Sequence, residues 1–239
     1  MAFIHGKKTV VLYNGANLTS YFNEATMNNS VETAETTAFG NDAKTYITGL
    51  RDGTISANGM FDGVAGGIDA TLSSVIGAVA SDVITVCPEG ATAGTRTMSC
   101  AARETSYEIS SPVSDVVAAN MEVQSDGGID IGKLLDGLSA VSASGNGSSL
   151  DNGAATTNGG VAYLHVTANT RDGASTFKVQ HSSDNVSFVD LATFSSVSAS
   201  ATGGERVAVT GTVNQYLRSD YAPGGSSGSV TFTIAFTRK

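Results

Sequence analysis

The stretch Val230-Thr231-Phe232-Thr233-Ile234-Ala235-Phe236-Thr237 alternates large apolar side chains with threonine and alanine. Successive side chains of a β-strand point to opposite faces of a sheet, so a period of two predicts a strand with one buried face. Two shorter runs, Phe177 to Val179 and Val207 to Val209, repeat this rhythm. Residues 161 to 239 are therefore predicted to form a β-sandwich of immunoglobulin-like or jelly-roll type.

The first part of the chain carries the same alternation around Ile55 and Ala57 and again from Val117 to Val123. Between these runs, apolar side chains recur at helical spacing and predict one amphipathic helix packed on a sheet; they are Ile68, Leu72, Val75, Ile76 and Val79. The apolar residues from Ile131 to Leu138 fit either a helix or a closing strand. The fold class expected for the whole chain is mainly β.

Residues 141 to 160 are rich in Gly, Ser and Asn, as in Ser142-Ala143-Ser144-Gly145-Asn146-Gly147. Such a composition is typical of flexible coils. We therefore expect a linker here, with one domain over residues 1 to 140 and a second over 161 to 239.

Residues 28 to 50 are polar, rich in threonine and without clear periodicity. Phe39, Tyr46 and Ile47 are large apolar side chains scattered within it. This pattern predicts a long loop, and long loops in folded domains often carry function.

Composition and charge exclude several classes of protein. The chain has 239 residues, of which 41% are hydrophobic and 15% charged, and this is a folded rather than a disordered composition. The formal net charge is −9, so the basic groove of an ordinary nucleic-acid binder is not expected. No apolar run approaches the ~20 residues of a membrane span. No export signal is visible, which favours free thiols at Cys87 and Cys100 over a disulfide.

Catalytic and metal-binding patterns are weak. The sequence His181-Ser182-Ser183-Asp184 contains the residue types of a triad, but a triad is assembled from separated segments, and a turn explains these residues better. The three histidines show no metal-ligand spacing, and no Gly-rich phosphate motif is present. We expect no catalytic residues, no metal and no cofactor, and therefore no enzyme.

Several motifs in residues 1 to 140 resemble the major tail tube proteins of long, non-contractile-tailed bacteriophages. They are Asn14-Gly15-Ala16-Asn17-Leu18-Thr19, Gly49-Leu50-Arg51-Asp52-Gly53, Cys87-Pro88-Glu89-Gly90 and Ser106-Tyr107-Glu108. The resemblance implies a β-sandwich or barrel with one packed helix. It also implies hexameric rings that stack into the virion tail tube after synthesis in the host cytoplasm, with tape measure and tail terminator or initiator proteins as partners.

Under this resemblance, the long polar segment becomes an inter-ring loop, and its expected contact residues are Thr33, Thr36, Phe39, Tyr46 and Ile47. The acidic wall would let DNA pass without binding. Residues 161 to 239 resemble β-sandwich modules appended to phage virion proteins and are expected on the tube exterior. Host surface glycans are candidate partners there, with Tyr163, Tyr216 and Tyr221 as contacts. A carbohydrate-binding adhesin and a capsid decoration protein are the alternative functions.

Overall fold

The computed structural model describes residues 3–239, which form two compact units. Unit 1 comprises the chain up to Ser20 together with Asp82–Ser99 and Asp130–Lys239, and unit 2 comprises Tyr21–Ser81 and Cys100–Ile129. The architecture is mainly β with antiparallel sheets and one short α-helix, as the sequence predicts.

The predicted boundary between residues 1 to 140 and 161 to 239 does not match these units. Strand β7 (Ala118–Val141) is continuous across the point where the first domain was expected to end, and it belongs to both units. Its last residues pair with β15 (Val230–Arg238), from Val230 opposite Val141 to Phe236 opposite Lys133. The apolar residues from Ile131 to Leu138 are therefore strand, because they complete a sheet of unit 1.

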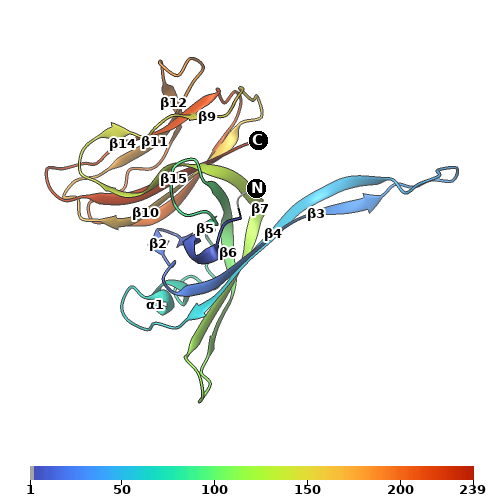
Figure 1. Ribbon diagram of the computed structural model, residues 1–239, viewed down its shortest axis with the longest axis horizontal. Helices are drawn as coiled ribbons and strands as arrows, with labels where there is room; N and C mark the ends of the chain where they lie inside the picture. The colour runs from blue at the N-terminus through green and yellow to red at the C-terminus, as the bar shows by residue number, and fades with distance from the viewer. Residues whose placement is uncertain (1–2) are drawn as a thin grey trace. The chain divides into compact units, whose positions relative to one another are not determined.

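Unit 1 contains the predicted β-sandwich (Figure 1). One sheet has the strand order β13-β10-β15-β7, and the other has the order β12-β11-β14. A common core joins the two sheets, with Phe177 from one and Phe232 from the other at a ring-centroid distance of 4.7 Å. Besides β7 and β15, the strands of these two sheets are β10 (Gly160–Asn169), β11 (Thr176–Ser182), β12 (Val189–Thr193), β13 (Gly203–Val209) and β14 (Tyr216–Ala222).

The expected flexible linker is part of this sandwich. Within it, β8 (Gly145–Asn146) and β9 (Leu150–Asp151) both pair with β14. Glycine is needed within these residues for close approach, because a Cβ on Gly159 would lie 2.1 Å from the Val209 backbone carbonyl oxygen. The prediction of a linker over residues 141 to 160 is therefore wrong, since the small side chains permit packing.

A second set of strands in unit 1 has the order β5-β1-β2. These are β5 (Asp82–Cys87), β1 (Val10–Tyr13) and β2 (Ala16–Asn17), preceded by the short helix η1 (Gly6–Lys8). Cys87 and Cys100 are both buried thiols. Burial raises the pKa of the Cys87 thiol to about 12.

Unit 2 is built on β3 (Phe22–Glu35), β4 (Tyr46–Met60) and the first half of β7, in that order, with β6 (Arg96–Ser110) entering it at Cys100. The helix α1 covers only Ile68–Leu72, so the helix predicted as far as Val79 is wrong beyond Leu72. The Ser73 hydroxyl bonds the Asp69 carbonyl, and Gly77 has a φ of 76°, a backbone conformation that a helix cannot contain. Within residues 3–239, no helix has the length and apolar character needed to cross a membrane.

Candidate functional site

Residues 28 to 50 form most of a long β-hairpin, and the predicted loop is wrong. Strands β3 and β4 pair from Phe22 opposite Gly59 to Glu35 opposite Tyr46, which leaves only residues 36 to 45 as a connection. In Figure 1 the end of this hairpin runs out beyond the other strands of unit 2. Strand β3 pairs only with β4 among the described strands, so its other edge is open.

Every residue from 29 to 52 is exposed, and we call this segment the ribbon. It includes all five residues expected to make inter-ring contacts: Thr33 in β3, Thr36 and Phe39 in the connection, and Tyr46 and Ile47 in β4. Tyr46 and Ile47 are neighbours in a strand, so they point to opposite faces. The ribbon thus presents large apolar side chains on both faces; they are Val31, Phe39, Tyr46, Ile47 and Leu50.

The outer end of the ribbon is held by its own polar contacts. Lys44 pairs with Glu35 at 3.0 Å, and the hydroxyls of Thr36 and Thr45 are 3.0 Å apart. These groups are solvent-exposed, where an ion pair contributes at most about 1 kcal/mol. They define the local turn and leave Phe39 fully exposed.

The inner end of the ribbon is fixed to β7. The Arg51 Nη2 donates to the Ile129 carbonyl at 2.6 Å, and the Asn29 Nδ2 donates to the same oxygen at 3.4 Å. The Gln124 Nε2 also donates to the Gly53 carbonyl and the Asp52 carboxylate. The ribbon therefore projects from a fixed base.

The sheet of β3, β4 and β7 has one buried and one polar face. On the buried side lie Ile55, Ala57, Met121 and Val123. On the other side, cross-strand pairing aligns three rows of polar residues, which we call the polar face. The rows are Glu24 with Asn58 and Asn120, Thr26 with Ser56 and Glu122, and Asn28 with Thr54 and Gln124.

The polar face contains hydroxyls, amides and two carboxylates but no cation. The Asn58 Nδ2 donates to the Glu24 carboxylate at 3.2 Å. Sequence reasoning did not single out this face. The sequence does contain a sign of this face, because the residues that alternate with Ile55 and Ala57 are all polar.

All the excess negative charge of the chain belongs to unit 2. Unit 2 holds three of the 13 basic and 12 of the 22 acidic side chains, which gives −9, whereas unit 1 holds ten of each. Among its cations, Lys44 pairs with Glu35 and Arg103 pairs with Asp126. Unit 2 therefore repels other anions.

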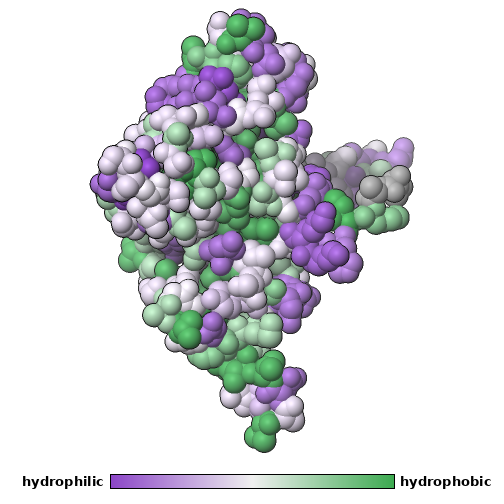
Figure 2. Space-filling model, turned by 60° about the vertical axis from the view of Figure 1, so that its left-hand side comes forward, coloured by the Kyte–Doolittle hydropathy of each residue, from purple (hydrophilic) through white to green (hydrophobic). Residues whose placement is uncertain are grey.

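The connection between β6 and β7 is a second exposed apolar segment of unit 2. Val113 and Val116 lie in this connection, and Ile109 lies just before it in β6; all three are exposed, and Val113 completely so. This connection lies at the lower end of Figure 1, and the same end of Figure 2 shows hydrophobic residues among hydrophilic ones. Such patches commonly mark contact surfaces.

Of the three tyrosines expected to contact glycans, one is buried and two are half-buried. Tyr163 is buried, and its hydroxyl donates to Asp130 at 2.7 Å, so the prediction for this residue is wrong. Burial and the Asp130 charge raise the pKa of Tyr163. Tyr221 is half-buried with its ring 5.1 Å from that of Phe232, and Tyr216 is half-buried in β14.

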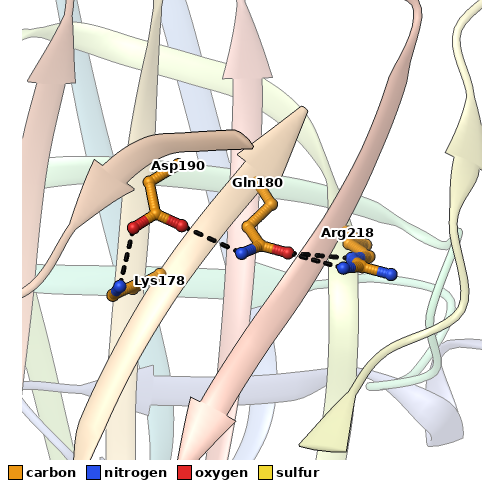
Figure 3. A network of polar contacts seen from close by, with 4 residues as sticks. All are labelled: Lys178, Gln180, Asp190 and Arg218. Atoms are coloured by element: carbon orange, nitrogen blue, oxygen red, sulfur yellow. Dashed lines mark hydrogen bonds and ion pairs between the residues drawn. The ribbon is translucent and has the colours of Figure 1, made fainter. Parts of the chain in front are cut away.

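The outer face of the second sheet in unit 1 carries a polar network instead (Figure 3). Asp190 accepts from Lys178 at 2.6 Å and from the Gln180 Nε2 at 2.9 Å, and Arg218 donates twice to the Gln180 Oε1. The Arg218 guanidinium lies 3.9 Å from the centre of the Phe188 ring. These side chains therefore supply one another's hydrogen-bond partners.

The residues His181 to Asp184 form a turn, and no triad is assembled from them. The Ser182 hydroxyl donates to Asp184 at 2.7 Å, and the Asp184 carboxylate also accepts from the backbone of Val186 and Ser187. These bonds lower the pKa of Asp184 to about 2. His181 accepts from the Asn214 backbone instead. The part of the chain that the structure describes contains no cluster of potential metal ligands.

No protein-family model and no curated protein matches the chain. Among solved structures, it is similar to a chain of the virion of a native gene transfer agent particle, with a TM-score of 0.45 and 13% identity over 54% of this chain and 98% of that one. A chain of the sheath/tube terminator of an extracellular contractile injection system gives a TM-score of 0.46 and 15% identity, covering 55% and 97%. The Dit protein of phage SPP1, from a hub adsorption apparatus, gives a TM-score of 0.38 and 16% identity, covering 96% and 98%.

Proposed function

We propose that the chain is a structural subunit of a viral tail tube. Copies join through the ribbon into rings and stacked rings, and the polar face lines the conduit through which the genome leaves. The resemblance of residues 1 to 140 to tail tube proteins implies six copies in a ring. It also implies tape measure and terminator or initiator proteins as partners.

The observation that carries the proposal is a two-stranded ribbon exposed on both faces. An isolated hairpin is at best marginally stable in water, so a ribbon of this length needs a partner surface. Burying one large apolar side chain contributes about 1.5–3 kcal/mol, and the ribbon offers Val31, Phe39, Tyr46, Ile47 and Leu50. The open edge of β3 adds unpaired backbone groups that another chain can bond.

The polar face suits a conduit for DNA because it offers nothing that holds phosphate. Duplex DNA carries one negative charge per ~1.7 Å, and proteins that retain it supply Lys and Arg. The polar face has neither, and unit 2 is strongly acidic. Repulsion is screened over ~8 Å at physiological salt, so the wall prevents adhesion without driving transport.

The test is assembly of the purified full chain, measured by size-exclusion chromatography and negative-stain microscopy. We expect rings or tubes from the wild type. The variant Phe39→Ser/Tyr46→Ser/Ile47→Ser is expected to remain a single chain with an unchanged circular dichroism spectrum.

The matched control is Val186→Ser/Val189→Ser, which removes exposed apolar side chains from unit 1 and should assemble normally. Normal assembly of the ribbon variant would show that the ribbon does not form the contact between copies of the chain. A wild-type chain that stays single at high concentration, and is missing from purified virion tails, would overturn the proposed function.

A further inference from the structure

A pocket of about 530 Å³ lies in unit 1, beside the start of β6, the last part of β7 and the end of β15. Its volume is in the range of about 300–1,000 Å³ that is usual for small-molecule sites. The backbone brings these segments together, because the Leu134 N–H donates to the Thr95 carbonyl and Lys133 is the β-partner of Phe236.

Three cations line the pocket, Arg96, Lys133 and Arg238. Neither the Arg96 side chain nor the Lys133 side chain forms a hydrogen bond or an ion pair with any residue from 3 to 239. One carboxylate, that of Glu89, lines the same pocket and forms no ion pair with these cations. Since unit 1 has as many acidic as basic side chains, this excess of positive charge is local.

Arg238 is held in place by backbone carbonyls. Its Nη1 donates to Asn152 at 3.4 Å and its Nη2 to Ala154 at 2.5 Å. Its Nε is buried and has no acceptor among the described residues. Carbonyls orient a guanidinium without neutralising it, so the positive charge remains available to an anion.

The rest of the lining adds two kinds of contact. Glu89 and Asn152 supply oxygens that can accept hydrogen bonds from hydroxyl groups, and Ile131 supplies an exposed apolar wall. We propose that this pocket binds an acidic saccharide, a sugar that carries a carboxylate or a phosphate. The three cations bind the anionic group, Glu89 and Asn152 bind sugar hydroxyls, and the carbon face of the ring packs on Ile131.

Nucleic acid fits this pocket less well. Three cations in one concave pocket match a single oxyanion, whereas a nucleic-acid strand needs a track of basic side chains along its backbone. A neutral sugar would leave the cations without a partner.

The experiment measures the affinity of the full chain by isothermal titration calorimetry. The ligands are glucose 6-phosphate and glucuronate, compared with glucose and inorganic phosphate. Both acidic sugars are expected to bind at least tenfold more tightly than glucose or inorganic phosphate. Lys133→Gln and Arg96→Gln are each expected to weaken binding about tenfold. Lys7→Gln removes one exposed charge outside the pocket and should leave the affinity unchanged.

The measurement is repeated on the ribbon variant Phe39→Ser/Tyr46→Ser/Ile47→Ser, so that it does not depend on assembly. The proposal is overturned if neither acidic sugar binds to the folded wild type, or if glucose or inorganic phosphate binds equally well. It is also overturned if the two pocket variants, shown to be folded by circular dichroism, bind like Lys7→Gln.

Discussion

His165 is a buried histidine that is uncharged in the folded chain. Its Nδ1 accepts from the Gly15 N–H at 3.3 Å, so the proton is on Nε2, which donates to the Thr85 hydroxyl at 2.9 Å. Thr85 in turn lies 2.9 Å from the Ser99 hydroxyl. Burial lowers the pKa of His165 from 6.5 to about 3.

This depressed pKa predicts that stability falls at mildly acidic pH. Below pH 6.5 the unfolded chain takes up a proton at this position and the folded chain does not, so the free energy of unfolding decreases as pH falls toward 3. The loss is about 1.4 kcal/mol per pH unit below 6.5. Urea unfolding at several pH values between 7 and 5 measures it. His165→Gln should show a flatter dependence, and equal slopes for the two proteins would refute this account.

Gly59 shows how a single residue position allows β3 to reach β4. A Cβ at this position would lie 2.1 Å from the Tyr21 carbonyl oxygen. That oxygen accepts a hydrogen bond from the Met60 N–H at the end of the β3–β4 pairing. We expect Gly59→Ala to lower the free energy of unfolding by about 1–3 kcal/mol, the usual cost of overpacking. Gly203→Ala, where a Cβ meets nothing within 4 Å, is the control and should change the urea midpoint far less.

At the scale of elements, the ribbon is expected to be the segment most affected by assembly. Both faces of residues 29 to 52 are exposed in the single chain. The backbone hydrogen bonds of such a ribbon open easily, and its amide hydrogens then exchange with solvent. Hydrogen exchange should therefore be fast there in the single chain and at least tenfold slower in assembled rings or tubes. The buried half of β4, around Ile55, should exchange slowly in both. A ribbon that exchanges equally fast in both states would argue against its burial.

Strands with one buried face and the first turn of the helix were predictable from sequence, whereas the ribbon, β8 and β9 were not. The alternation of β15 and of β4 around Ile55 reflects a core on one side. The ribbon lacks that alternation because neither of its faces is buried, so its strands look like a loop. The Gly/Ser-rich residues 141 to 160 look flexible, yet small side chains are what β8 needs to approach β14. The polar face depends on cross-strand register, which composition does not reveal.

For the whole molecule, the concentration of charge in unit 2 gives the last prediction. If the polar face lines the conduit, Glu24→Lys/Glu122→Lys places two cations where DNA passes and leaves the ribbon unchanged. Tubes should still form, and genome ejection from virions carrying the variant should slow, because Lys retains phosphate. The matched control is Glu108→Lys/Asp115→Lys, which changes the charge of unit 2 equally at exposed positions outside the polar face. Time-resolved DNA release measures the difference. Equal slowing by the two variants would mean that net charge matters and the polar face does not, and no slowing by either would contradict the proposed wall. Slowing by the first variant alone would identify the polar face as the wall that DNA meets.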